Sequence, residues 1–254
     1  MSYDTRLCRI LTKRQLTTDV FDITVDAGEL AQQARPGQFA QFFVPGKTLR
    51  RPISICGIDR AAQTLRFVFQ IRGEGTAQLA ALEEGECADI LVPLGSGFTP
   101  DYSKPAVFVG GGIGVPPLLE AAKPFGENAS VVLGFRNKDS VILIEDFERN
   151  GNRALIATDD GSFGYHGLVT ELLGDLPFET VYACGPTPML KAVSRLAEER
   201  GVPCFVSLEE RMACGVGACL GCAVRLRKES GEEYYGHVCK DGPVFDSRRI
   251  VWEG

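Results

Sequence analysis

Four cysteines near the end of the chain constrain its fold more than any other feature. They are spaced as Cys214-x4-Cys219-x2-Cys222-x16-Cys239. The first three match the C-x4-C-x2-C spacing of plant-type [2Fe–2S] sites, in which a fourth cysteine follows further along the chain. Small residues fill the gaps between them, so backbone N–H groups can turn toward the sulfur atoms. The spacing predicts a [2Fe–2S] cluster held by four thiolates.

A structural zinc site is the main alternative, because zinc also accepts four cysteine ligands. Zinc ribbons usually carry two C-x2-C pairs, whereas here a triplet is followed by one distant cysteine. A Rieske centre needs two histidine ligands, and the only histidines are His166 and His237, which disfavours it. The spacing favours iron–sulfur over zinc.

The other five cysteines have different surroundings. Cys8, Cys56, Cys87 and Cys204 lie in apolar, strand-like segments, where cysteine behaves as a small hydrophobic residue, and we expect them to be buried. Cys184 ends an expected strand of a parallel sheet. Because ligands bind at the carboxyl ends of such strands, Cys184 is a candidate site residue.

Composition and charge exclude several classes of protein. The chain has 254 residues, of which 44% are hydrophobic and 24% charged, as in ordinary globular proteins. A net charge of −6 disfavours a broad nucleic-acid-binding surface. No apolar run approaches the roughly 18 residues that span a bilayer, and no apolar signal core follows the N-terminus. We expect a soluble, cytoplasmic protein that binds neither nucleic acid nor membrane.

Residues 1–100 show the pattern of an antiparallel β-barrel. Short segments rich in β-branched, aromatic or alternating apolar residues are separated by Pro- and Gly-containing turns. One short helix is expected at residues 76–82. Many short strands with a single small helix favour a closed barrel. The expected strands are residues 6–11, 20–25, 38–44, 64–71 and 86–92.

Residues 101–208 follow a different pattern, in which buried strands alternate with helices such as residues 188–200. This alternation predicts a parallel sheet covered on both faces. The expected strands are residues 106–109, 131–135, 154–158, 180–184 and 204–208. Residues 209–254 form a small Cys- and Gly-rich module. The predicted class is therefore mixed β and α/β, with three domains at residues 1–100, 101–208 and 209–254.

A glycine-rich turn indicates a nucleotide site in the middle segment. Gly110, Gly111, Gly112 and Gly114 follow an apolar strand and precede a helix. Glycines let the backbone approach a pyrophosphate, whose charge the helix N-terminus meets. Tight strand–helix turns also use glycine for steric reasons alone. Pro117 stands where the third glycine of G-x-G-x-x-G would stand, which disfavours an ordinary Rossmann dehydrogenase.

Two short motifs in the first segment indicate a second nucleotide. Arg51 and Ser54 lie in a strand-like run, where arginine suits forked phosphate contacts. Gly75 and Thr76 precede the short helix and form a possible anion cradle. Each motif alone is explained by a surface arginine or a helix cap. Beside a nucleotide domain and an iron–sulfur module, they predict a flavin-type nucleotide.

These motifs resemble the ferredoxin–NADP reductase superfamily in order and spacing. They are Arg51-Pro52-Ile53-Ser54, Gly73-Glu74-Gly75-Thr76, residues 110–117, Thr158-Asp159-Asp160-Gly161 and Cys184-Gly185-Pro186. The tail, residues 210–222 with 238–245, more specifically resembles the electron-transfer subunits of NAD-linked (type 1B) dihydroorotate dehydrogenases. The resemblance covers essentially the whole chain.

The resemblance implies three groups of site residues. FAD contacts are implied at Arg51, Pro52, Ile53, Ser54, Val68, Phe69, Gln70, Gly75 and Thr76. NAD contacts are implied at Gly110, Gly111, Gly112, Gly114, Cys184, Gly185 and Pro186. The cluster ligands are Cys214, Cys219, Cys222 and Cys239. The family often has an aromatic–basic pair where this chain has Phe69-Gln70, so a phosphate or ribose contact is less expected there.

The resemblance also implies the reaction. A partner subunit with FMN oxidises dihydroorotate to orotate in pyrimidine (UMP) biosynthesis, and electrons pass through the [2Fe–2S] cluster to FAD and on to NAD+. A flavin fits this place because it exchanges single electrons with a cluster and a hydride with NAD. The implied complex is a heterotetramer with two copies of each chain. No acid–base set for dihydroorotate is evident in this chain, which agrees with catalysis in the partner.

Alternatives remain at the level of partner and nucleotide. Similar subunits serve NADPH–ferredoxin transhydrogenases and sulfide dehydrogenases, and a zinc-stabilised docking module on an inactive nucleotide-binding scaffold is an alternative of another class. Arg136 and Lys138, after the second strand of the middle segment, suit the 2′-phosphate of NADP. Asp139, the Glu145-Asp146 pair and a balance of 9 basic against 14 acidic residues in 101–208 argue against a phosphate pocket, and the family resemblance favours NAD. Arg136 and Lys138 are then solvated loop charges. We predict NAD.

Overall fold

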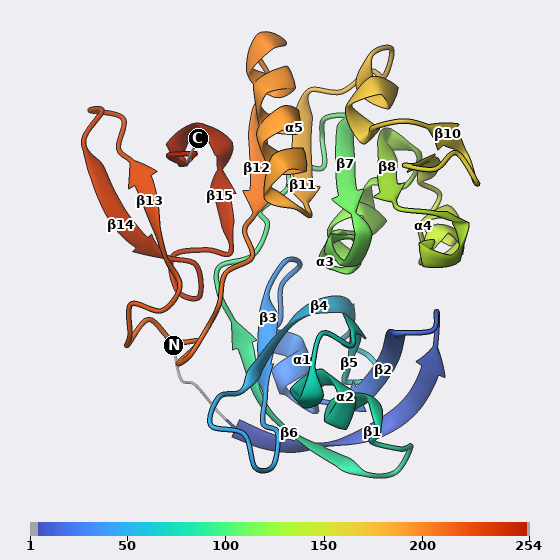
Figure 1. Ribbon diagram of the computed structural model, residues 1–254, viewed down its shortest axis with the longest axis vertical. Coiled ribbons are helices and arrows are strands. Elements are labelled where there is room, and N and C mark those ends of the chain that lie inside the picture. Colours follow the sequence, from blue (N-terminus) through green and yellow to red (C-terminus); the bar gives the residue numbers. More distant parts are fainter. Residues whose placement is uncertain (1–4, 253–254) are drawn as a thin grey trace.

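The computed structural model describes residues 5–252, and its first part is a closed six-stranded barrel (Figure 1). All neighbouring strands are antiparallel, in the order β1-β2-β5-β4-β3-β6. The strands are β1 (Thr5–Gln15), β2 (Val20–Asp26), β3 (Phe39–Phe42), β4 (Arg51–Asp59), β5 (Thr64–Gln70) and β6 (Cys87–Leu94). Two short helices, α1 (Leu30–Gln33) and α2 (Glu74–Ala80), lie in its connections. The predicted barrel is confirmed, although the expected strands did not include β4, whose start was recognised only as a strand-like run, and α1 was missed.

Alternation of side chains along the strands fills the barrel. Ala40 and Phe42 on β3 point inward, and the ring of Phe42 packs edge-on against Phe67 at 5.0 Å between ring centroids. The same alternation contradicts one prediction. Cys87 is exposed rather than buried, because β6 turns Ala88 and the next alternate residues toward the core. Cys8, Cys56 and Cys204 are buried as predicted.

The second part is a seven-stranded sheet in the order β10-β9-β8-β7-β11-β12-β15. Its strands are β7 (Ala106–Gly111), β8 (Ala129–Phe135), β9 (Arg153–Thr158), β10 (Tyr165–His166), β11 (Thr180–Cys184), β12 (Cys204–Ser207) and β15 (Val244–Asp246). All pairings are parallel except that of β15 with β12. The sheet was expected to be parallel throughout, but the C-terminal module adds β15 as an antiparallel edge strand. Local sequence patterns did not predict this pairing, because β15 lies far from β12 along the sequence.

Helices cover both faces of this sheet. They are α3 (Pro116–Ala122), α4 (Ile144–Arg149) and α5 (Thr187–Glu199), with 3-10 turns η1 (Gly112–Gly114), η2 (Lys123–Asn128), η3 (Lys138–Ser140) and η4 (Val169–Leu173). On β7, Val107 and Val109 pack on the α5 side, whereas Ala106 and Phe108 pack on the α3 side. No helix within residues 5–252 is long and apolar enough to cross a membrane.

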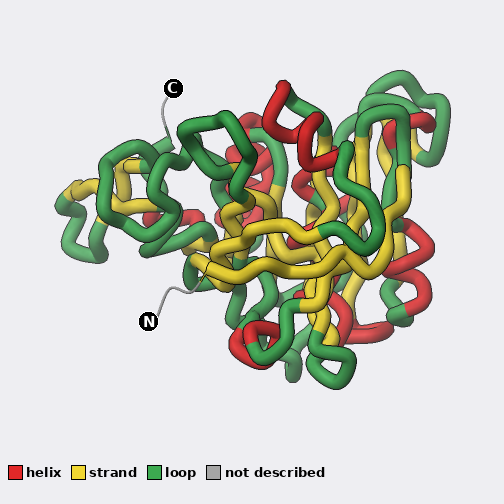
Figure 2. Tube along the Cα trace, turned by 90° about the horizontal axis from the view of Figure 1, so that it is seen from below, coloured by secondary structure: helices red, strands yellow, loops and turns green. Residues whose placement is uncertain are grey.

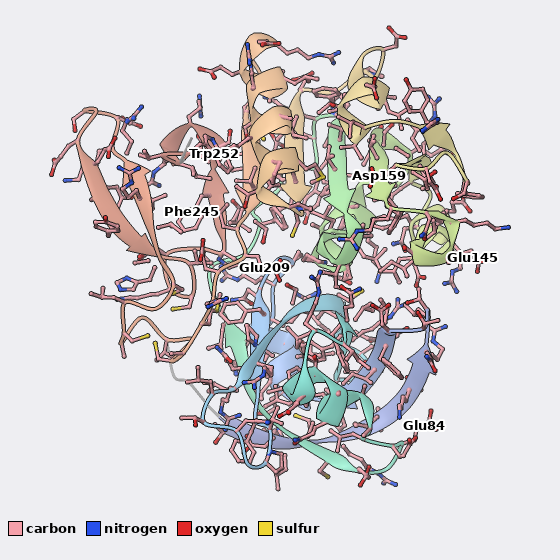
Figure 3. The ribbon with its side chains drawn as sticks, viewed as in Figure 1. Glu84, Glu145, Asp159, Glu209, Phe245 and Trp252 are labelled. Atoms are coloured by element: carbon pink, nitrogen blue, oxygen red, sulfur yellow. The ribbon has the colours of Figure 1, made fainter. Side chains whose placement is uncertain are left out.

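The third part is a hairpin of β13 (Ala223–Arg227) and β14 (Glu233–His237), with η5 (Ser247–Arg249) after β15. It lies to one side of the barrel and sheet in both views (Figures 1 and 2). Phe39 and Leu94 at the end of the barrel share a core with Val238 and Phe245 of this module. Phe245 lies between the hairpin and the sheet (Figure 3). The module is therefore packed on both other parts.

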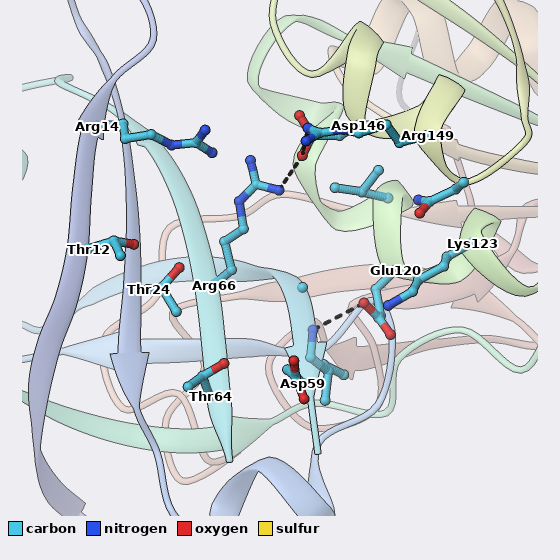
Figure 4. Close-up of a pocket in the computed structure, with 14 residues that line it drawn as sticks. Thr12, Arg14, Thr24, Asp59, Thr64, Arg66, Glu120, Lys123, Asp146 and Arg149 are labelled. Carbon is cyan, nitrogen blue, oxygen red and sulfur yellow. Dashed lines mark hydrogen bonds and ion pairs between the residues drawn. The ribbon is translucent and has the colours of Figure 1, made fainter. Parts of the chain in front are cut away.

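Arg66 joins the barrel to the sheet domain through buried charge. Its guanidinium donates to both carboxylate oxygens of Asp22 on β2, at 2.9 and 3.0 Å, and to Asp146 on α4 at 2.6 Å (Figure 4). Asp22 is 2% exposed. Burial alone would lower the pKa of Arg66, but the hydrogen bonds to Asp22 and Asp146 raise it above its usual value. Nearby, Glu120 of α3 accepts the N–H of Ile58 at 3.1 Å.

We predict that Arg66→Met lowers the free energy of unfolding by about 3 kcal/mol, as for breaking a buried ion pair. The figure is at the lower end of the usual range because Arg14 still pairs with Asp22. Urea unfolding measures the change. The exposed pair Arg195–Glu199 supplies the control, and Glu199→Gln should change stability by no more than about 0.5 kcal/mol. Equal losses in the two variants would contradict the role given to Arg66.

Candidate cofactor sites

The cysteine loop folds so that backbone N–H groups point at sulfur. The Sγ of Cys214 accepts from the N–H groups of Val216 at 3.5 Å and Ala218 at 3.3 Å. The Sγ of Cys239 accepts from the N–H of Gly217 at 3.1 Å. Gly215 and Gly217 have φ angles of +72° and +77°, which favour glycine. These turns direct the backbone N–H groups of the loop toward the cysteine sulfur atoms.

The same hydrogen bonds change thiol acidity. Burial opposes ionisation of Cys214, yet the N–H of Val216 and the Cys219 thiol lower the pKa of Cys214 to about 6. Burial and the adjacent Cys222 thiol instead raise the pKa of Cys239 to about 12. Two like groups this close repel when both are ionised, and a bound cation removes that cost.

The thiols fall into two pairs. The Sγ atoms of Cys214 and Cys219 are 3.4 Å apart, and Cys222 and Cys239 share a hydrogen bond. Among the described residues, no three Cys, His or acidic side chains converge on a point that would hold one metal ion. The pairing of the four thiols matches the two irons of a [2Fe–2S] cluster, each of which takes two thiolates, so the residues present suit that cluster.

The predicted FAD residues of β4 and α2 lie together. A Cβ atom at Gly75 would stand 2.3 Å from Nε of Arg51, so only glycine allows this guanidinium to lie over the start of α2. Arg51 donates to the carbonyl oxygen of Leu49 at 2.5 Å, and none of the described carboxylates pairs with it. The Thr76 hydroxyl donates to the carbonyl of Gly73 and accepts the N–H of Arg72, which closes the first turn of α2. Gly75 and Thr76 thus lie inside the helix rather than before it, because the helix begins at Glu74, two residues earlier than predicted.

The residues of β5 present backbone rather than side chains to this region. Val68 packs between the barrel and the sheet domain, and Phe69 packs inside the barrel. The pairing of β4 with β5 ends at Ile55 opposite Phe67. Beyond that point the backbone of residues 68–70 has no strand on its β4 side. Any contact from Val68 or Phe69 to a ligand must come from this backbone, and the Gln70 side chain already bonds to Asp19 at 2.6 Å.

The two halves of the predicted NAD site meet at the carboxyl ends of β7 and β11. Gly110 and Cys184 are partners in the strand register. A Cβ at Gly114 would lie 2.5 Å from the carbonyl oxygen of Cys184, so glycine is required for this close approach. Gly112 has a φ of +53°, and a Cβ there would meet no atom within 4 Å. Its backbone is thus open to a ligand at the edge where parallel sheets bind them.

Cys184 is buried at this edge. Burial and the nearby Glu209 raise the pKa of Cys184 to about 12, although a hydrogen bond with Ser207 opposes the shift. Glu209 lies where barrel, sheet and C-terminal module meet (Figure 3). A pKa this high favours the neutral thiol of Cys184 at neutral pH.

The charged residues weighed in the choice between NAD and NADP have different surroundings. Arg136, Lys138 and Asp139 are exposed, as solvated loop charges would be. Asp146 is bound to Arg66 at 2.6 Å, so its charge is already paired within the protein. Glu145 is exposed at the outer side of the sheet domain (Figure 3). Of the acidic side chains weighed here, Asp139 and Glu145 are exposed and Asp146 is paired.

A cavity of about 620 Å³ lies beside Arg66, between the barrel and helices α3 and α4 (Figure 4). None of the predicted site residues lines it. Its walls are Thr12, Arg14, Thr24, Gly57, Ile58, Asp59, Thr64, Arg66, Leu119, Glu120, Lys123, Asp146, Arg149 and Asn150. Four of its seven charged side chains, Arg14, Arg66, Asp146 and Arg149, already take part in ion pairs, so we do not assign a cofactor to it.

Comparison with known families agrees with this arrangement. Residues 209–251 match the model for the iron–sulfur cluster binding domain of dihydroorotate dehydrogenase B. The chain is 41% identical over 253 residues to "Dihydroorotate dehydrogenase B (NAD(+)), electron transfer subunit" of Geobacillus thermodenitrificans, covering 95% of this chain and 96% of the relative. The protein of the same name from Streptococcus mutans is 40% identical over 252 residues, covering 95% and 96%.

This chain belongs to the family of dihydroorotate dehydrogenase B electron transfer subunits. The resemblance inferred from its motifs is thus confirmed, and so is the preference for iron–sulfur over zinc.

Solved structures confirm the fold. A chain described in work on flavin-based electron bifurcation by the NADH-dependent reduced ferredoxin–NADP oxidoreductase is 32% identical, with a TM-score of 0.85, and the match covers 98% of this chain and 91% of that one. The ferredoxin reductase of carbazole 1,9a-dioxygenase, at 21% identity and a TM-score of 0.66, shares the fold over 80% of this chain and 68% of its own.

We predict that Cys219→Ser loses the cluster but keeps FAD. Serine oxygen is a hard ligand that replaces thiolate poorly on iron, while the predicted FAD residues lie in the barrel. Iron analysis and visible absorption measure both groups. Cys87→Ser is the matched control, since Cys87 is exposed and far along the chain from the four predicted cluster thiols. Two irons per chain in a stable Cys219→Ser protein would contradict the ligand assignment.

We predict that Arg51→Ala weakens FAD binding by about 1.5–3 kcal/mol, the contribution of a hydrogen bond to a charged group. Arg51→Lys should restore only part of this, because lysine lacks the forked donor. FAD occupancy after dialysis against a series of FAD concentrations measures the effect. Arg195→Ala, on the exposed face of α5, should bind FAD as the unaltered protein does. Equal occupancy in all four proteins would refute the contact.

Proposed function

We propose that this chain carries electrons from a dihydroorotate-oxidising partner through its own [2Fe–2S] cluster and FAD to NAD+. One observation carries the proposal. The cysteine module shares a core with the end of the barrel, and the barrel also packs against the edge where β7 and β11 end. One chain thus brings a thiolate loop, a flavin-type barrel and a dinucleotide turn together, in the order that electrons would follow.

We assign the three segments accordingly. Residues 1–100 bind FAD through Arg51, Pro52, Ile53, Ser54, Gly75 and Thr76 and through the backbone of Val68, Phe69 and Gln70. Residues 101–208 bind NAD at Gly110, Gly111, Gly112, Gly114, Cys184, Gly185 and Pro186. Residues 209–254 hold the cluster through Cys214, Cys219, Cys222 and Cys239. The bound flavin supplies the exchange between single electrons and a hydride.

The protein's own residues bind and orient these groups. The guanidinium of Arg51, which forms no ion pair with the described carboxylates, provides a forked donor for a phosphate. The N–H groups of Val216, Gly217 and Ala218 point at the cysteine sulfurs, where they favour the thiolate form. Because Gly110 and Gly114 lack side chains, the loops after β7 and β11 approach closely at the dinucleotide edge and leave the Gly112 backbone open.

The family to which the chain belongs supports a partner subunit that oxidises dihydroorotate. An electron transfer subunit implies a catalytic subunit, and we propose that it contains FMN and forms a heterotetramer with two copies of each chain. Leu220, between two cluster ligands, is 75% exposed and offers an apolar contact at the cluster loop. Among the described residues, no acid–base group is assembled for dihydroorotate. We also propose a cytoplasmic location, where thiols stay reduced.

A transhydrogenase-type complex is the second candidate. The match at 32% identity to a chain of the NADH-dependent reduced ferredoxin–NADP oxidoreductase favours it over other partners. The relatives at about 40% identity carry the dihydroorotate dehydrogenase name and favour the first candidate. Both share the order of cofactors and differ in the partner subunit and its substrate.

We predict that the complex with the FMN subunit reduces NAD+ when dihydroorotate is added, and that neither subunit alone does so. Absorbance at the NADH band measures the rate. With the isolated, flavin-loaded chain and an artificial acceptor, kcat/KM should be higher for NADH than for NADPH, because the domain carries a surplus of acidic residues. A preference for NADPH, or no response to dihydroorotate, would move the transhydrogenase-type function ahead.

A further inference from the structure

Gln41 is a polar residue on the face of β3 that meets the cysteine module. Alternation along β3 sends Ala40 and Phe42 into the barrel core, so Phe39 and Gln41 point to the opposite side. Phe39 on that side belongs to the core shared with the module. Gln41 therefore faces the module, and its residue is fully buried, with 0% exposure.

Both polar atoms of this side chain lack a partner. Neither Nε2 nor Oε1 of Gln41 hydrogen bonds to any described residue. Such a buried carboxamide is costly, because it has given up its bonds to water without replacement. Its backbone is firmly held, since Arg50 donates to the carbonyl oxygen of Gln41 at 3.2 Å and pairs with Asp89. An apolar side chain of the same length would make the fold more stable at this position, unless a bound group hydrogen-bonds to the amide.

The surroundings of the carboxamide identify that group. A Cβ placed on Gly215 would lie 2.8 Å from Nε2 of Gln41, so the amide packs against the backbone next to the cluster ligand Cys214. Across the strand pair, Gln41 stands opposite Pro52. Cross-strand partners point to the same face, so the predicted FAD strand lies on one side of Gln41 and the cluster loop on the other.

We propose that the Gln41 side chain donates a hydrogen bond to the sulfur atoms of the cluster on its Cys214 side, and so raises the cluster's reduction potential. This inference rests on the cluster of the proposed function. Nε2 is the amide atom nearest the loop, and it is a donor, which sulfur ligands accept. A donor stabilises the reduced cluster more than the oxidised one, because the reduced cluster carries more negative charge. Gln41 acts as a positioning and tuning residue supplied by the barrel.

The test is a redox titration of the complete, cofactor-loaded chain, with the reduced cluster followed by electron paramagnetic resonance and the flavin by absorbance. Gln41→Met keeps the length of the side chain without its N–H donor. We expect the one-electron equilibrium of the cluster to shift about tenfold toward the oxidised form, a fall of about 59 mV, with the flavin potential unchanged. Gln41→Glu, whose carboxylate opposes the added electron, should lower the cluster potential at least as far.

Gln38 provides a matched control from the same region. It is also buried, but its carboxamide is satisfied, accepting the N–H of Arg35 at 2.8 Å and donating to the carbonyl of Gly95 at 2.6 Å. Gln38→Met should lower the melting temperature and leave the cluster potential unchanged.

The possible outcomes separate this inference from the proposed function. An unchanged cluster potential in Gln41→Met and Gln41→Glu overturns it, and so does a shift confined to the flavin, which would assign the amide to FAD. If the unaltered protein binds no iron, the proposed function fails as well. If Gln41→Met does not fold, Gln41→Glu alone decides, since a potential equal to that of the unaltered chain refutes the hydrogen bond.

Discussion

The core between the end of the barrel and the cysteine module is the contact on which the arrangement depends. Phe39 and Leu94 of the barrel are buried with Val238 and Phe245 of the module, and β15 of the module then pairs with the edge of the sheet. Burying such side chains stabilises by about 1.5–3 kcal/mol each, so a loop rich in cysteine and glycine gains a fixed position that its own composition could not supply. The thiols are thereby held beside the strand predicted to bind FAD.

Ion pairs and a close backbone contact also fix how the parts of the protein pack together. Arg66 ties the barrel to α4 through Asp146, while its fork is held by the buried Asp22. Where β7 and β11 end, Gly114 allows the two loops to touch. The Arg66 contact requires charges that are paired away from water. The Gly114 contact requires a residue without a side chain. The sheet domain is therefore held against the barrel by the Arg66 contacts as well as by apolar packing.

Much of this could be predicted from local patterns. Alternating apolar residues and their turns indicated the barrel, and strand–helix alternation indicated the sheet, since both depend on side chains near in sequence. The exposure of Cys87 was missed because the inward side of a strand is set by its register with β1, which apolar composition does not reveal. The pairing of Asp146 with Arg66 was not predicted, because the two residues lie 80 positions apart in the sequence.

The spacing of four cysteines, a glycine turn and a few strand motifs determined by themselves the cofactor classes, because ligand geometry and backbone approach are short-range requirements. The tertiary structure alone decided which groups lie together. It paired the thiols two by two, placed Arg51 over Gly75, and set the unpartnered amide of Gln41 against Gly215. Gln41 has no motif, and its position depends on packing between segments about 170 residues apart, which no local pattern records.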